Sequence, residues 1–96
     1  MSDVITKAVD ALNEKMGGDG FDGSIKVEIE GEGCIMIDEN GARAGDEYAE
    51  CTLTADTETF EGMLTGDVNP TSAFMSGGLK VDGDMSAAMK LGAILS

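Results

Sequence analysis

The chain has 96 residues, no histidine, and a net charge of −13 that results from 19 acidic and 6 basic residues. This length suits one domain, residues 1–96, and leaves no room for a second. The negative charge argues against nucleic acid and anionic membranes as partners, because both need a cationic footprint. Without histidine the chain lacks the commonest general base and a common metal ligand, so we expect no catalytic residue, metal or cofactor.

The first predicted element is an amphipathic helix over residues 3–16. Ser2 is a suitable N-cap, and Gly17-Gly18 should end the helix. The apolar residues fall within about 140° of a helical wheel, which leaves one side to pack on a core; they are Val4, Ile5, Ala8, Val9, Leu12 and Met16.

Two glycine-rich loops begin like ligand-binding motifs but do not complete them. In the loop 17–23, Asp19 and Asp22 are three residues apart, whereas an EF-hand needs acids two apart, so we predict no calcium site. The turn 31–33 starts like a dinucleotide fingerprint, but Met36 occupies the position of the third glycine and no helix follows.

Alternation of apolar and polar residues predicts strands at 25–29, 34–38 and 48–55, with a weaker strand at 42–45. The Asn40-Gly41 pair favours a tight hairpin between the second and third of these segments in chain order. One face of the sheet should be exposed to water, because it carries Lys26, Glu28, Glu30 and Glu50.

The C-terminal half alternates helices and a strand with little connecting chain. Asp56 should cap a helix that bears Phe60, Met63 and Leu64 on one side and ends at Gly66. Asn69 is a good N-cap for a short helix with Pro70 at its first position, in which we expect Phe74 and Met75 to face inward. Leu79 and Val81 then alternate with polar residues as in a strand, and Asp84 caps the last helix.

This order of elements predicts an α+β fold. Strands framed by helices indicate one five-stranded, mostly antiparallel mixed sheet with the helices covering one face. The N-terminus lacks the basic and apolar runs of a signal peptide, and no apolar stretch is long enough to span a membrane. We therefore expect a cytoplasmic protein without stable membrane insertion.

The last helix carries more apolar surface than a helix on the surface of a domain needs. From Met85 to Leu95 only Ser86 and Lys90 are polar. Such a face must be covered by a lipid, a partner subunit or additional core. Met63, Met75, Met85 and Met89 belong to the three C-terminal helices, where methionine either fills gaps in the core or adapts to a variable ligand.

Several segments in the same order resemble the sterol carrier protein 2 domain, a lipid-binding family. The resemblance rests on Asn69-Pro70-x-Ser72-Ala73-Phe74, Gly77-x-Leu79-Lys80-Val81-x-Gly83-Asp84-Met85 and Ala88-Met89-Lys90-Leu91, and it extends back through residues 49–56 and 63–66. It implies an apolar tunnel between the helices and the inner sheet face that takes fatty acids, acyl-CoA or sterols. By carry-over, the candidate lipid-binding residues are Phe60, Met63, Leu64, Phe74, Met75, Met85, Met89 and Leu91.

The sheet order of this family also separates the two cysteines. Cys34 and Cys51 would lie on strands either side of a third, too far apart for a disulfide, so we expect both to be reduced. The surface is far more acidic than in the basic relatives that dock on membranes. We therefore expect lipid binding, but not docking on anionic membranes.

Two hypotheses remain from the sequence. The first is a non-catalytic carrier that holds one apolar lipid between sheet and helices. The second is a protein-interaction module or homodimer that uses the apolar C-terminal helix. No pattern of residues supports an enzyme.

Overall fold

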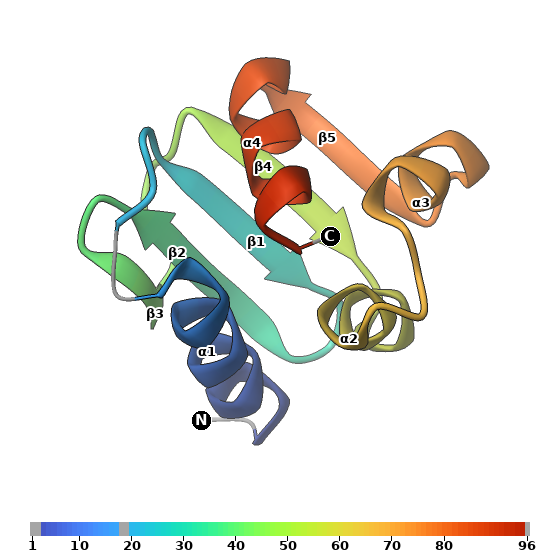
Figure 1. Ribbon diagram of the computed structural model, residues 1–96, viewed down its shortest axis with the longest axis horizontal. Helices are drawn as coiled ribbons and strands as arrows, with labels where there is room; N and C mark the ends of the chain where they lie inside the picture. The colour runs from blue at the N-terminus through green and yellow to red at the C-terminus, as the bar shows by residue number, and fades with distance from the viewer. Residues whose placement is uncertain (1–2, 18–19, 96) are drawn as a thin grey trace.

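The computed structural model describes residues 3–17 and 20–95, which form one sheet and four helices (Figure 1). The predicted elements are all present, in the predicted order. They are α1 (Asp3–Met16), β1 (Ile25–Ile29), β2 (Gly33–Asp38), β3 (Gly41–Ala44), β4 (Cys51–Ala55), α2 (Thr57–Thr65), α3 (Pro70–Ser76), β5 (Leu79–Gly83) and α4 (Met85–Leu95).

The sheet has five strands in the order β3-β2-β1-β4-β5. β1 pairs with β4 in parallel, and the other neighbouring strands pair antiparallel. The predicted α+β class with a mostly antiparallel, mixed sheet is therefore confirmed. The third strand begins one residue earlier than predicted, at Gly41, which pairs with Asp38 across the Glu39-Asn40 turn.

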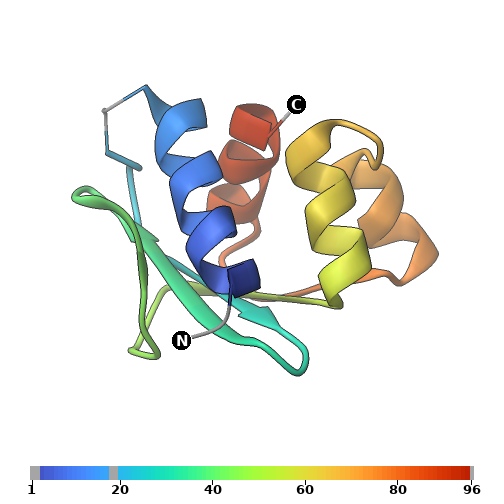
Figure 2. The same ribbon diagram turned by 90° about the horizontal axis from the view of Figure 1, so that it is seen from below.

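All four helices lie on one face of the sheet (Figure 2). The core between the two layers is centred on β1, where Ile25, Val27 and Ile29 are at most 1% exposed. Each buried aliphatic side chain of this size contributes about 1.5–3 kcal/mol relative to an exposed one. α1 packs over β2 and β3, whereas α4 packs over β4 and β5, so the two edges of the sheet are covered by different helices.

The connection between β3 and β4 crosses the other face of the sheet. β3 is an edge strand and β4 lies beyond β1, so the 45–50 segment has to pass over β2 and β1. An ion pair of 3.0 Å between Lys26 Nζ and Asp46 Oδ1 fastens it there, and the Glu50 N–H donates to Ser24 Oγ. Our expectation that the strand begins at Tyr48 is wrong, because pairing with β1 starts only at Cys51, where the crossing ends.

Met36 is an exception on this otherwise polar outer face. It shares a row with Lys26 and Arg43, yet it is only 2% exposed. The 45–50 segment covers it, since a Cβ on Gly45 would lie 3.2 Å from Met36 Cγ. A small apolar contact thus holds the crossing segment against the outer face.

Side-chain caps begin three of the helices, as predicted. The Asp56, Asn69 and Asp84 side chains each accept a hydrogen bond from a backbone N–H two or three residues further on. The donors are Thr59 at 2.7 Å, Ser72 at 3.2 Å and Ser86 at 2.9 Å. The predicted cap Ser2 lies outside the described residues.

Glycines follow three helices where the backbone must turn to a left-handed conformation. Gly66 ends α2 with a φ of 88°, Gly17 follows α1 with a φ of 66°, and Gly77 follows α3 with a φ of 88°. Glycine has no Cβ, so it adopts this left-handed conformation at little cost. Gly18, also predicted to end α1, is not among the described residues.

Asn13 on α1 protects the outer edge of the sheet. Its Oδ1 accepts from the Ala42 N–H at 2.9 Å, and its Nδ2 donates to the Ala42 carbonyl at 3.0 Å. Ala42 lies on the edge strand β3, so these backbone groups have no neighbouring strand to pair with on that side. The amide of Asn13 takes that place and ties α1 to the sheet.

We predict that Asn13→Ala lowers the free energy of unfolding by about 1 kcal/mol, because two hydrogen bonds outweigh the higher helix propensity of alanine. Urea denaturation measures this change. Glu14→Ala is the matched control, since Glu14 is the next, exposed residue of the same helix and should change stability little. An Asn13→Ala variant as stable as the wild type would contradict the role of this edge contact.

Candidate functional site

The last helix, α4, has two apolar stripes that face different surroundings. Ala87, Leu91 and Leu95 are buried against the core. A second stripe contains Met85 and Met89, which are 45% and 72% exposed. The excess of apolar surface seen in the sequence is therefore only half covered by the core.

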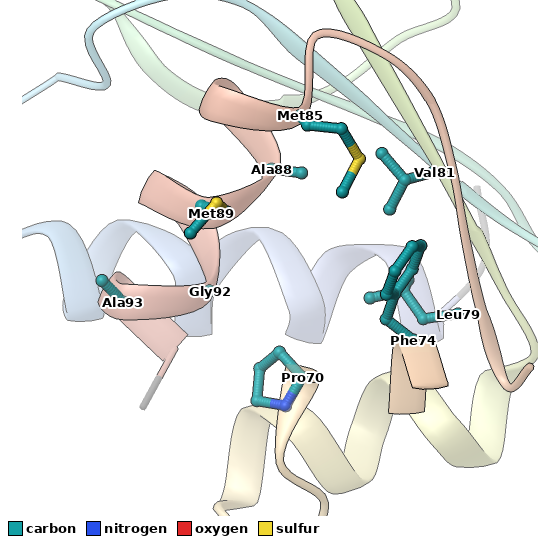
Figure 3. Close-up of a pocket in the computed structure, with 9 residues that line it drawn as sticks. All are labelled: Pro70, Phe74, Leu79, Val81, Met85, Ala88, Met89, Gly92 and Ala93. Carbon is teal, nitrogen blue, oxygen red and sulfur yellow. The ribbon is translucent and has the colours of Figure 1, made fainter. Parts of the chain in front are cut away.

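The second stripe forms one wall of an open apolar pocket of about 430 Å³. α3 and β5 supply the other walls, and Figure 3 shows their side chains opposite those of α4. This volume lies within the usual range for sites that take small molecules. The lining residues are Pro70, Phe74, Leu79, Val81, Met85, Ala88, Met89, Gly92 and Ala93.

A second, much smaller void of about 20 Å³ lies deeper, between the helices and the inner sheet face. Its volume is close to that of a single water molecule, so the core beneath the pocket is nearly filled. Four residues line both spaces: Pro70, Leu79, Ala88 and Gly92. The pocket and the void therefore share one wall.

The eight candidate residues fall into three groups in the structure. Phe74, Met85 and Met89 line the open pocket. Phe60, Met63 and Leu91 line the small inner void and are at most 1% exposed. Leu64 and Met75 line neither of these two spaces.

The expectation that Phe74 and Met75 face inward is wrong. Phe74 is 43% exposed at the pocket mouth, and Met75 is 81% exposed. α3 has only seven residues, and it packs on its neighbours through Pro70 and Ala73 instead. Since these two positions are three apart, they form one side of the helix and turn Met75 away from it.

Small residues that shape the pocket were not among the candidates. Ala88, Gly92 and Ala93 share one side of α4 with Met85 and Met89, at spacings of three and four residues. Their side chains are short, so they leave space between α4 and Pro70. Helical spacing could have identified this stripe, whereas the eight candidates are all large apolar residues.

Gly92 is the narrowest element of the shared wall. A Cβ added there would lie 3.7 Å from Pro70 Cβ, which is an ordinary van der Waals contact. Alanine would therefore fit, whereas a longer side chain would extend into the space that α3 and α4 leave between them.

No charged residue lines the pocket, and all of its lining side chains are apolar. Arg43 Nη1 contacts Asp38 Oδ2 at 2.8 Å on the outer sheet face, and this hydrogen bond lowers the pKa of Asp38. Lys90 Nζ pairs with Asp22 Oδ2 at 3.3 Å on the surface of α4. No charged or polar side chain is fully buried anywhere in the described part of the chain.

Neither cysteine has the surroundings of a nucleophile. Burial is the main cause that raises the pKa of both thiols, and nearby acids raise it further. Cys34 on β2 and Cys51 on β4 flank β1 and are both free, as predicted. A raised pKa keeps a thiol protonated, the opposite of what a reactive cysteine needs.

Residues 3–17 and 20–95 contain no cluster of acidic and cysteine side chains that could hold a metal ion. Within the same ranges, no helix combines the length and apolar character that crossing a membrane requires.

Solved structures of other proteins share this fold. Sterol carrier protein 2 of Aedes aegypti, determined as a complex with palmitate, superposes with a TM-score of 0.78 at 18% identity and covers 100% of this chain and 97% of its own. The sterol carrier protein domain 2 of Helicoverpa armigera gives a TM-score of 0.76 at 24% identity, with 96% and 85% covered.

Sequence relatives indicate the same relationship. Human sterol carrier protein 2 is 35% identical over 82 residues, which is 84% of this chain but 14% of the human protein. Hydroxysteroid dehydrogenase-like protein 2 of Bos taurus is 34% identical over 93 residues, 95% of this chain and 21% of that protein. The chain thus spans a small part of these relatives. A sequence model of the SCP-2 sterol transfer family matches residues 8–96, and the chain belongs to this family.

Proposed function

We propose that the chain binds one elongated apolar lipid in the pocket between α3, β5 and α4, as a carrier or binding domain. The observation that carries this proposal is an open pocket of about 430 Å³ whose nine lining residues include no polar or charged side chain. Enclosure in such a pocket gains about 0.8 kcal/mol per buried methylene, so a long chain needs few polar contacts. Fatty acids, acyl-CoA and sterol-like molecules are the ligand classes that the family suggests.

Phe74, Met85 and Met89 are the proposed ligand contacts at the pocket mouth. A tail that passes the shared wall would reach Phe60, Met63 and Leu91, which have to move to admit it because the inner void is only about 20 Å³. Methionine suits such a site, since its flexible side chain adapts to ligands of different shape. We assign no ligand contact to Leu64 or Met75.

The same proposal includes a non-catalytic role in a reducing compartment such as the cytoplasm. The two free thiols have raised pKa values, and the chain contains no histidine. Thiols that stay protonated at neutral pH are not activated nucleophiles, and a chain without histidine lacks the commonest general base.

A second candidate function is self-association or docking on another protein. It is favoured by the exposed apolar side chains of Phe74, Met75, Met85 and Met89, which lie on α3 and α4. Exposed apolar groups that gather on one surface often mark interaction sites. A homodimer through this surface would compete with lipid entry, because three of the four side chains line the pocket.

The lipid proposal predicts that Gly92→Leu weakens binding about tenfold or more, because the added side chain occupies the space opposite Pro70. Titration with a pyrene-labelled hexadecanol and a pyrene-labelled hexadecanoic acid measures the affinity. Gly92→Ala should remain folded and bind nearly as the wild type does. Ser86→Leu adds the same side chain to an exposed position of α4 and should bind normally.

Failure of both probes to bind the wild-type protein, together with no lipid found by native mass spectrometry, would refute the lipid proposal. Equal binding by the Gly92→Leu and Ser86→Leu variants would place the ligand elsewhere than in this pocket.

The non-catalytic proposal predicts slow alkylation of the thiols. Because a raised pKa lowers the thiolate fraction, iodoacetamide at pH 7.5 should label Cys34 more slowly in the native protein than in the urea-unfolded chain. Cys51, which is 0% exposed, should remain unlabelled until unfolding. Mass spectrometry of the two tryptic peptides measures both rates. Faster labelling of either cysteine in the native state would reveal an activated thiol.

Met75 separates the two candidate functions, since it is 81% exposed but lines neither the pocket nor the inner void. If self-association uses the exposed side chains of α3 and α4, Met75→Gln should weaken it about fivefold or more and leave lipid affinity unchanged. Sedimentation equilibrium over a range of concentrations measures the first effect. A strict monomer at the highest concentration would eliminate the homodimer.

A further inference from the structure

The pocket offers a lipid headgroup no cation. Its nine lining residues include no basic side chain and none that can donate a hydrogen bond. The chain has only six basic residues and no histidine, so the position of every side chain that could pair with an anion can be traced.

Three of these six cations are already paired with acids. Lys26 pairs with Asp46 on the outer sheet face, and Arg43 lies between Asp38 and Glu47 on the same face. Lys90 pairs with Asp22 beside α4. An anionic headgroup would have to compete with these carboxylates.

The other three cations belong to surfaces that do not line the pocket. Lys80 lies between Leu79 and Val81 on β5, and since those two line the pocket, the alternation along a strand directs Lys80 to the opposite face. Lys7 and Lys15 are on α1, which packs over β2 and β3, whereas the pocket is formed with β5 at the other edge of the sheet.

The net charge makes the lack of a cation more costly for an anion. With 19 acids against 6 bases, the molecule carries −13 within a radius of gyration of 11.6 Å. Charge of one sign at this density creates potentials of several kT at the surface. A carboxylate or the phosphates of acyl-CoA must enter this negative field, whereas an alcohol, ester or sterol hydroxyl does not.

We propose that the pocket selects lipids with an uncharged headgroup over lipids with an anionic one, such as fatty acids. Hydrophobic enclosure of the tail is the same for an acid and an alcohol of equal length, so the headgroup decides between them. The selectivity rests on the lipid-binding function proposed above, and it concerns which lipid class the same pocket takes.

The first test compares pyrene-labelled hexadecanol with pyrene-labelled hexadecanoic acid at pH 7.5, each below its aggregation concentration. In about 0.01 M NaCl the alcohol should bind about tenfold more tightly than the acid. In about 0.5 M NaCl the difference should shrink to about threefold or less, because salt screens the repulsion. Both probes have the same tail, so salting-out of the tail cancels in the ratio.

A second test adds a cation at the pocket mouth. Met89 is 72% exposed and lines the pocket, so Met89→Lys should fold normally and place an ammonium group beside the headgroup. It should shift the acid-to-alcohol affinity ratio about threefold toward the acid, relative to the neutral Met89→Gln control, whose side chain is as long as that of the native methionine. Circular dichroism establishes that both variants are folded.

The outcomes separate the two proposals. An acid that binds the wild type as tightly as the alcohol at low salt, or a ratio that neither salt nor Met89→Lys changes, overturns the headgroup selectivity and leaves lipid binding intact. Absence of binding by both probes overturns lipid binding itself, and the selectivity with it.

Discussion

The parallel pairing of β1 with β4 is the constraint on which the rest of the structure depends. β1 is the central strand, and its residues Ile25, Val27 and Ile29 are all at most 1% exposed. Parallel strands cannot be joined by a tight turn, so the chain must travel between β1 and β4 through two further strands and a crossing segment. That crossing uses the face without helices, where the Lys26–Asp46 ion pair and the buried Met36 fasten it. All four helices lie on the opposite face, and β5 forms the edge of the sheet beyond β4.

The pocket follows from this arrangement together with the composition of α4. Two of its walls, α3 and β5, lie beyond β4, while α1 covers the opposite half of the sheet. α4 lies between these two regions and has an apolar stripe for each. On the core side it carries Leu91 and Leu95, and on the pocket side it carries two methionines together with alanines and a glycine. The pocket is thus a region where the side chains are too small to fill the space between helices and sheet.

Much of the fold could be predicted from the sequence because the local signals agree with one another. The apolar spacing of residues 3–16, the alternation at Ile25–Ile29 and the caps Asp56, Asn69 and Asp84 each determine an element by local physics. The start of β4 could not be predicted in the same way. Tyr48 and Glu50 alternate as in a strand, but they belong to the crossing segment, and only the long-range pairing at Cys51 decides where the strand begins.

The candidate site was predicted less completely, for a related reason. Large apolar side chains such as Phe60 and Phe74 look alike in a sequence, yet one fills the core and the other lies at the pocket mouth. The exposure of Phe74 depends on which side of α3 packs on its neighbours, and the buried residues Pro70 and Ala73 define that side. Conversely, Gly92 and Ala88 shape the pocket because they add little or no side chain. Helical spacing places them in one stripe with Met85 and Met89, but only the folded chain brings Pro70 and Leu79 opposite that stripe.

The surface charge also bears on the site. An unpaired cation near the mouth would favour anionic lipids, and here the acids outnumber the bases by 19 to 6. Lys90, the basic residue that follows Met89, is held by Asp22 at 3.3 Å. An exposed pair of this kind contributes little to stability, at most about 1 kcal/mol, but it reduces the positive field that an incoming carboxylate would meet. The apolar lining and the acidic surface therefore act in the same direction, since one provides enclosure for a tail and the other disfavours a negative headgroup.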